Sequence, residues 1–384
     1  MEHLPKELLE NVLRRLTVYD IIRAGCACKL LRALVSSSPP IQHRPHVTIL
    51  LLRHPHALAS ELTIELPRLP AWAYDADRDA WLTLSLAFLQ PYLPHLPNPV
   101  ASDGGLLCFG SGCDFIICNP ITKSWRRLPH LTEIYQWFDD DSVQAFGLHY
   151  ISASGAYEFV LLNHWAPKSL SSKSIVATFS STSSQWVCGL PLTMPVGCKL
   201  HNDTIISWNS RLYSLWTRKG VLVMFSFFEG TWTEVEVPML EYPLTLLKAF
   251  LLEVNGSLYM VGGVGPVWHH NNYREQPTTM RIWKMLAPSD VWEESTRMPY
   301  LVFREFEQRI DFDCIQCLGK NGVMYLKGSL SDCLMFDFNR DEWKWLKDLE
   351  MVVSPGELNK ANFVKEGIYF LIVQRWHAGI NSVH

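Results

Sequence analysis

A hairpin with a tryptophan in its second strand recurs along most of the chain. In residues 115–129, FIICNPITKSWRRLP, an apolar strand runs into a polar turn, and a second strand opens with a tryptophan and stops at a proline. The repeats are spaced about 52 residues apart, which is a period typical of β-propellers. Their tryptophans are Trp81, Trp125, Trp186, Trp232, Trp292 and Trp343.

A second pattern lies between the tryptophans and supplies the other strands. It is a turn residue, glycine or asparagine, flanked by apolar and aromatic runs. Such residues accept the positive φ of a tight hairpin, so each repeat is predicted to be four antiparallel strands. The turn residues are Gly104, Gly155, Asn209, Gly256, Gly322 and Gly367.

The two ends of the repeat region each carry half a repeat. The tryptophan hairpin of residues 71–84 has no glycine-turn hairpin before it, and the hairpin of residues 358–373 has no tryptophan hairpin after it. If the halves pair, two open sheet edges disappear. The expected fold is mainly β: a six-bladed β-propeller, with five contiguous blades and one shared between the ends.

The N-terminal residues instead show helical spacing. Leu8, Leu9, Val12, Leu13 and Leu16 fall on one side of a first helix, and two further short helices follow up to residue 35. About 35 residues cannot bury all these apolar groups internally, so they dock on the propeller as a cap or are kept for a partner. We expect a helical domain at 1–40, a connecting segment at 41–70 and the propeller at 71–384.

The segment LPKELLENVLRRLTVYDIIRAGCACKLLRALV resembles the F-box. The downstream SDGGLLCF and ICNPITKSWRRLP look like the first blade of plant F-box/kelch-repeat and F-box-associated domains. The resemblance implies binding to a Skp1-like adaptor and, through it, to a cullin complex that conjugates ubiquitin. The implied adaptor-binding residues are Leu4, Pro5, Leu8, Leu9, Val12, Leu13, Leu16, Ile21, Cys28 and Leu31.

Long insertions mark the propeller rim on which a target protein is expected to bind. They fall at 130–142, 163–172 and 264–279, and they combine large aromatic residues with charges, as recognition surfaces do. The alternative is that Trp165 and Trp268 tuck back as loop anchors. The candidate target-binding residues are Trp137, His164, Trp165, Trp268, His269, His270, Tyr273 and Arg274.

Charge and motifs argue against several other classes of protein. The net charge of −4 gives no basic field for nucleic acid, and the longest aliphatic run, 47–52, is too short to cross a bilayer. Without a signal-peptide pattern, we expect a cytoplasmic or nuclear protein. Most of the ten cysteines read as core residues, and Cys314 and Cys317 would point to opposite faces of a strand, so no metal or cofactor is expected.

No catalytic motif of a known propeller enzyme occurs in the chain, and neither a GxSxG elbow nor a phosphate loop is present. The sequence therefore predicts a non-catalytic substrate receptor of a Skp1-cullin-F-box ubiquitin ligase. The alternative is a kelch-type interaction scaffold without a role in ubiquitination. Binding of the adaptor, lost on Leu9→Asp and Leu13→Asp, is expected to separate the two.

Overall fold

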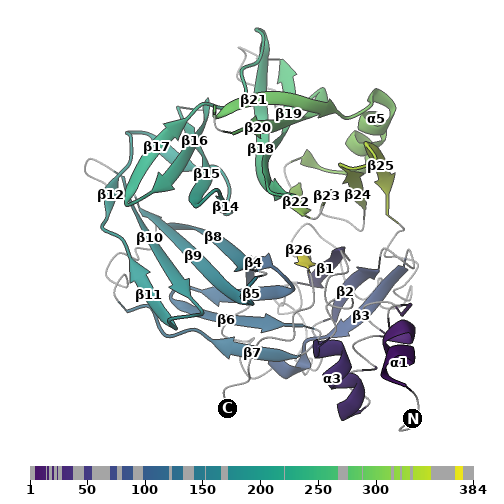
Figure 1. The fold of residues 1–384 in the computed structure, drawn as a ribbon. Coiled ribbons are helices and arrows are strands. Elements are labelled where there is room, and N and C mark those ends of the chain that lie inside the picture. Colours follow the sequence, from purple (N-terminus) through teal and green to yellow (C-terminus); the bar gives the residue numbers. More distant parts are fainter. Residues whose placement is uncertain are drawn as a thin grey trace, which may run out of the picture. The chain divides into compact units, whose positions relative to one another are not determined.

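The computed structural model shows a mainly β protein of β-propeller type with a few short helices (Figure 1). The chain divides into two compact units, which are treated separately below: Met1–Leu128, Tyr150–Ala156 and Gly367–His384 form the first, and Pro129–His149 and Tyr157–Glu366 form the second. The structure describes residues 5–13, 15–16, 20, 24, 28–37, 47–53, 70–75, 80–89, 98–120, 123–132, 142–151, 153–165, 172–219, 221–266, 276–287, 289–312, 315–320, 322–328, 332–346 and 368–374.

The first unit holds two helices and two four-stranded sheets. The helices are α1 (Lys6–Leu13) and α3 (Lys29–Ser37), and a 3-10 turn, η2, covers Ala87–Leu89. One sheet has the order β26-β1-β2-β3, from Ile368–Gln374, Val47–Arg53, Pro70–Asp75 and Ala80–Ser85. The other has the order β4-β5-β6-β7, from Asn98–Asp103, Leu106–Ser111, Asp114–Asn119 and Ser124–Arg127.

The second unit holds four sheets, which follow one another in chain order along an arc in Figure 1. The β8–β12 sheet contains β8 (Val143–Ile151), β9 (Ala156–Trp165), β10 (Lys173–Ser180), β11 (Gln185–Cys188) and β12 (Leu192–Thr193). The β13–β17 sheet contains β13 (Cys198–Leu200), β14 (Ile206–Trp208), β15 (Arg211–Arg218), β16 (Val221–Phe228) and β17 (Thr231–Val235). The β18–β21 sheet contains β18 (Leu244–Val254), β19 (Ser257–Pro266), β20 (Thr279–Leu286) and β21 (Val291–Arg297). The β22–β25 sheet contains β22 (Gln316–Lys320), β23 (Val323–Lys327), β24 (Cys333–Asp337) and β25 (Glu342–Trp345).

The predicted hairpin turns are confirmed wherever the structure describes them. The backbone φ is positive at five of the six turn residues, between +47° and +80°. These five are Gly104, Gly155, Asn209, Gly256 and Gly322. Gly367 lies outside the described residues. Four of these turns join the first two strands of their sheet, as the sequence indicated, and the turn at Asn209 joins β14 to β15 because the short β13 comes before them.

The six repeated tryptophans all lie in the outermost strand of their sheet. Two residues before each of the last five is a residue with positive φ, so a left-handed turn residue and a tryptophan form one repeated unit. The left-handed residues are Lys123, Ser184, Gly230, Asp290 and Asp341. Trp186 and Trp292 also donate their indole N–H groups to the carbonyl oxygens of Pro129 and Glu236, both at 2.8 Å.

The number of blades differs from the expected six. The sheets from β4 to β25 are each made of consecutive strands, and these are the five blades that the structure shows. The two ends of the chain form a further sheet, but not from two pairs of strands. Only β26 comes from the C-terminal end, whereas β1, β2 and β3 come from the N-terminal side. The predicted strand in 358–367 lies outside the described residues.

The unexpected member of this sheet is β1, which the sequence analysis placed in a connecting segment. It pairs with β26 on one side and with β2 on the other, from Val47↔Gln374 to Leu52↔Ala71. The run VTILLL contains β-branched and aliphatic residues over the length of a strand. A six-residue run of this kind satisfies its backbone groups by entering a sheet, which a connecting segment would not do.

Neighbouring sheets of the second unit pack through apolar clusters. The β8–β12 and β13–β17 sheets meet around Val160, Leu162 and Trp216. The next interface gathers Leu215, Met224 and Met260, among others, and the last gathers residues of the β18–β21 and β22–β25 sheets. The two middle sheets, β13–β17 and β18–β21, therefore bury both of their faces, which a lone meander in water cannot do.

A helix that the sequence analysis did not predict, α5 (Tyr300–Arg309), connects β21 to β22. Its Phe303 and Phe306 are buried in the cluster between those two sheets, and the Phe306 ring lies 5.4 Å from the ring of Phe312. The segment YLVFREFEQR places apolar residues three apart on one side, which helical packing uses. The helix therefore anchors the connection to the interface between the two sheets.

The left-handed turns provide a test of this fold. Replacing Gly256 by alanine adds a Cβ that would meet no atom within 4 Å, but the backbone φ would stay near +76°. We therefore expect the free energy of unfolding to fall by about 1 kcal/mol, from backbone strain alone. Gly104→Ala should cost clearly more, because its Cβ would also lie 2.1 Å from Cγ of Tyr150. Denaturant unfolding of both variants measures this, and equal losses would contradict the assigned turn geometry.

Candidate partner-binding surfaces

The helical domain has a small apolar core of its own. Leu9 and Leu13 of α1 pack against Leu31 and Leu34 of α3, and all four are buried. Their spacing of four and three residues puts each pair on one side of its helix. Leu16, Ala24 and Cys28 are partly buried against this cluster. The four leucines therefore hold the two helices together.

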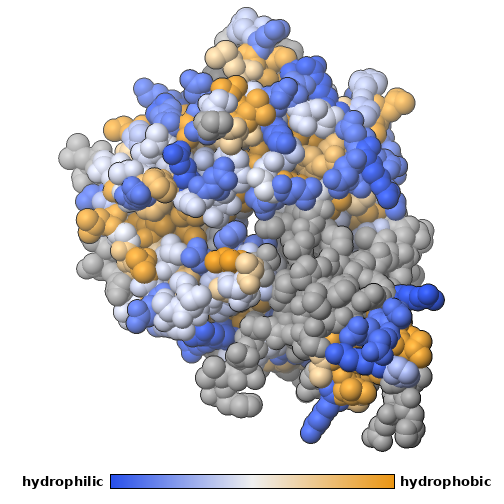
Figure 2. Space-filling model, viewed as in Figure 1, coloured by the Kyte–Doolittle hydropathy of each residue, from blue (hydrophilic) through white to orange (hydrophobic). Residues whose placement is uncertain are grey.

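A second apolar row of α1 faces solvent. Leu8 and Val12, four residues apart, are 52% and 54% exposed, Pro5 before the helix is exposed, and Leu30 of α3 is also exposed. Figure 2 shows apolar surface on these helices beside charged residues. An exposed row next to a satisfied core is the arrangement of a helix that can bind a partner.

The predicted adaptor-binding residues therefore fall into two groups. Pro5, Leu8 and Val12 are available to a partner, whereas Leu9, Leu13 and Leu31 belong to the core of the domain. Two adjacent rows of a short amphipathic helix look alike in sequence, so periodicity alone could not assign them. Of the remaining positions, Leu16 and Cys28 are partly buried, and Leu4 and Ile21 lie outside the described residues. The exposed Leu30 was missed by the sequence analysis.

Of the predicted target-binding residues, His164 and Trp165 are placed differently from expectation. They are the last residues of β9 and pair with Ser174 and Lys173 of β10, rather than lying in a loop. Both side chains are buried, at 5% and 8% exposure. The buried side chain of Trp165 agrees with the alternative that this residue anchors the segment, and His164 is buried beside it at the end of β9. The other candidates, Trp137, Trp268, His269, His270, Tyr273 and Arg274, lie outside the described residues.

Two histidines of the second unit, the buried His164 and the half-buried His201, have polar neighbours. The Nδ1 atom of His164 lies 3.0 Å from the hydroxyl of Ser174, and its ring meets Trp216 edge-on at 4.8 Å. Burial lowers the pKa of His164, although hydrogen bonds with the backbone of Lys173 and Cys198 oppose this. Burial and then the charge of Lys248 lower the pKa of His201, whose Nε2 accepts the Ala249 N–H at 3.3 Å. Both rings are therefore suited to the neutral form.

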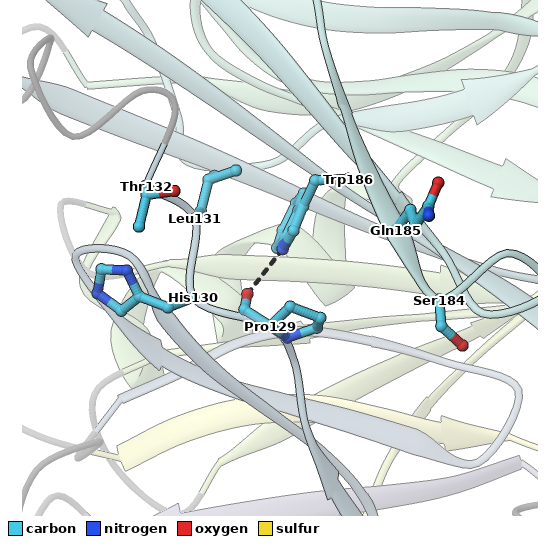
Figure 3. Close-up of a pocket in the computed structure, with 7 residues that line it drawn as sticks. All are labelled: Pro129, His130, Leu131, Thr132, Ser184, Gln185 and Trp186. Atoms are coloured by element: carbon cyan, nitrogen blue, oxygen red, sulfur yellow. Dashed lines mark hydrogen bonds between the residues drawn. The ribbon is translucent and has the colours of Figure 1, made fainter.

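A pocket of about 430 Å³ opens beside the outermost strand β11 (Figure 3). Its lining combines an indole and an aliphatic side chain with hydroxyl, amide and imidazole groups. The residues are Pro129, His130, Leu131, Thr132, Ser184, Gln185 and Trp186. The indole N–H of Trp186 is already committed to Pro129, so the pocket offers its ring face and the neighbouring polar groups for recognition. The first residues of the predicted 130–142 recognition segment thus line this pocket.

The cysteines that the sequence analysis placed in the core are buried. Cys108, Cys118, Cys198 and Cys333 are all inaccessible, and burial raises the pKa of each thiol. Cys317 is buried as well, and Cys314 lies outside the described residues. Within the described residues, no group of three or more histidine, cysteine or acidic side chains is placed to hold a metal ion. Within the same part of the chain, no helix has the length and apolarity to cross a membrane.

A small helical domain followed by propeller blades defines a two-part binding protein. Residues 1–43 match the F-box domain family, so the N-terminal domain is an F-box domain. The chain is 26% identical to SKP1-interacting partner 15 of Arabidopsis thaliana, over 90% of this chain and 92% of that protein. It is 23% identical to Protein UNUSUAL FLORAL ORGANS, over 89% and 78%, and 23% identical to an F-box/kelch-repeat protein, over 89% and 83%, both also from Arabidopsis thaliana. The relatives are thus plant proteins, among them a named F-box/kelch-repeat protein.

The buried His164 gives a prediction about pH. Burial lowers the pKa of His164 in the folded chain, so between that lowered value and the unfolded value of about 6.5 the unfolded chain binds more protons than the folded chain. The contribution to stability is therefore complete above about pH 6.5 and is lost as the pH falls. His164→Gln should reduce the acid-induced drop in the unfolding midpoint between pH 7.5 and 5.5.

The matched control for this variant keeps the histidine and removes its partner. Ser174→Ala should lower the midpoint at both pH values and keep the acid-induced drop, because the titrating ring is still buried. An equal drop in the parent protein and in His164→Gln would show that this ring does not govern the pH response.

Proposed function

We propose that the chain is the substrate-recognition subunit of a Skp1-cullin-F-box ubiquitin ligase. The F-box domain would bind a Skp1-like adaptor, and the propeller blades would bind the target protein. The observation that carries this proposal is the exposed row of Leu8, Val12 and Leu30 on an F-box domain whose own core is already filled. The name of a full-length relative, SKP1-interacting partner, supports the same partner.

In this proposal the chain performs no bond chemistry itself. Its contribution is proximity: holding a target near the rest of the ligase raises the effective concentration of the target lysine at the charged conjugating enzyme. Contact with the cullin would be indirect, through the adaptor. Such a complex would act in the cytoplasm or the nucleus. The helical domain predicted at 1–40 and the sheets that begin with β1 at Val47 would divide the two binding tasks.

The exposed row supplies a useful but incomplete part of the adaptor affinity. Burying three aliphatic side chains stabilises a complex by roughly 5–9 kcal/mol before the costs of association, which are about 4–15 kcal/mol. Because this gain does little more than offset the cost of association, each of the three side chains should matter for binding. Losing one or two of them should be visible as a large drop in affinity.

This gives a test in which exposed and buried positions are compared. Leu8→Asp and Val12→Asp place a charge in the proposed interface without entering the core, so we expect adaptor affinity to fall about tenfold or more while the helical signal is kept. Titration calorimetry of the full chain with a Skp1-like adaptor, alongside circular dichroism, measures both quantities.

Two control variants make the result specific. Val291→Asp changes an apolar side chain exposed to a similar degree on β21 and should leave adaptor binding unchanged. Leu9→Asp enters the four-leucine core and should lose binding together with helical structure, so it cannot test the interface. Undiminished binding by both Leu8→Asp and Val12→Asp would remove the support for this face as the adaptor site.

A further inference from the structure

Three connections between successive sheets of the second unit each expose two large apolar side chains. They join β11 to β13, β17 to β18 and β21 to β22. The pairs are Leu190 with Val196, Met239 with Tyr242, and Tyr300 with Leu301. At 71–93% exposure, these are the six most exposed large apolar side chains in the part of the chain that the structure describes. Single exposed apolar residues are normal, but a pair in the same topological place three times is not scatter.

The three connections hold the same place in the topology, from the last strand of one sheet to the first strand of the next, and in a propeller this place is one rim. Strands alternate in direction within each sheet, so every connection from a last strand to the next first strand leaves from the same end if the first strands are parallel. A parallel bridge shows this for the first two sheets: Phe146 donates to Asp203, and Ile205 donates back to Phe146, both at 2.8 Å. We call residues 189–197, 236–243 and 298–311 together the connection rim.

Neighbouring residues in the chain hold these side chains outward. In the first connection Met194 is buried in the cluster between two sheets, and in the third Phe303 and Phe306 are. In the second, Val237 and Leu240 pack against the cluster on either side of Met239. Because each segment is anchored, its exposed pair cannot collapse onto the protein. The rim is therefore a preformed apolar surface rather than a flexible one.

The charge next to this surface is acidic. Glu236 and Glu241 are exposed on the middle connection and form no ion pair within the described part of the chain. On α5, by contrast, Arg304 pairs with Glu307, and Arg309 pairs with Glu305. Residues 189–197 carry no charged side chain. A partner would therefore find apolar contacts flanked by uncompensated carboxylates.

We propose that the connection rim is the docking surface for the target protein. It takes a segment of the target that combines apolar side chains with lysine or arginine placed opposite Glu236 and Glu241. Methionine and tyrosine are among the residues enriched at protein interfaces, and both stand on the middle connection. The inference rests on the proposed function, and it names the part of the blades that does the recognition and the chemistry of what is recognised.

A displayed library of random peptides, selected on the full chain, tests the proposal directly. We expect enrichment of peptides that carry both apolar and basic residues. The affinity of the most enriched peptide should fall about tenfold in each of Leu190→Ser, Met239→Ser and Leu301→Ser. The double variant Glu236→Gln, Glu241→Gln should weaken binding and reduce its dependence on salt.

The matched control is Val291→Ser, an exposed apolar residue next to the turn between β20 and β21, at the opposite end of its strand from α5. It should change the affinity by less than about twofold. Failure to enrich any peptide, enrichment without basic residues, or unchanged affinity in the Met239 and Leu301 variants would overturn the proposal. So would a rim that is covered by a second copy, seen as variant-dependent dimerisation in sedimentation.

Adaptor binding, measured on the same samples, separates this inference from the proposed function. Loss of peptide binding with intact adaptor binding in the rim variants supports the division of tasks. If the parent protein binds peptides but no Skp1-like adaptor, the ligase role fails while the rim is retained as a peptide site. If it binds the adaptor but no peptide, the rim proposal fails alone.

Discussion

Apolar contact between neighbouring sheets is the interaction on which the second unit depends. A four-stranded meander has two faces, and each can be shielded only by another sheet. The clusters around Trp216, Met224 and Met324 fill these interfaces. Two of the repeated tryptophans add contacts at the outer edge: Trp186 and Trp292 donate to the carbonyl oxygens of Pro129 and Glu236, which follow the last strand of the preceding sheet in the chain. Packing thus joins the neighbouring sheets of this unit, and Trp186 and Trp292 each add a directional hydrogen bond.

This arrangement leaves the connections between sheets free to differ. Those in the second unit include a short strand, β12, an irregular segment with two prolines, and the helix α5, yet each inserts apolar residues into the same kind of interface. Packing therefore constrains the inward residues of each connection and leaves the outward ones open to selection for binding. That division is the usual basis for recognition on a rigid scaffold.

The sequence predicted those features that depend on local chemistry. A glycine or asparagine at a tight turn, and a tryptophan that follows a polar turn, indicate the same local structure in every repeat, and Gly256, Asn209 and Trp232 lie where they were expected. Features decided by distant contacts were missed. The strand β1 pairs with β26 from the other end of the chain, and His164 is buried by packing against Trp216. Nothing within a few residues of either position indicates those partners.

In the helical domain, the buried row of Leu9 and Leu13 and the exposed row of Leu8 and Val12 have different roles, but their energies are linked. A domain below about 40 residues has little core, and here four leucines provide most of it. A partner that binds only the folded domain stabilises it by mass action. Binding at Leu8 and Val12 therefore also stabilises the folded state of α1 and α3. Weakening the Leu9 and Leu13 row would lower the population of the competent form and reduce affinity without touching the interface. Affinity alone therefore cannot assign a residue of α1 to binding, whereas affinity measured together with helical content can.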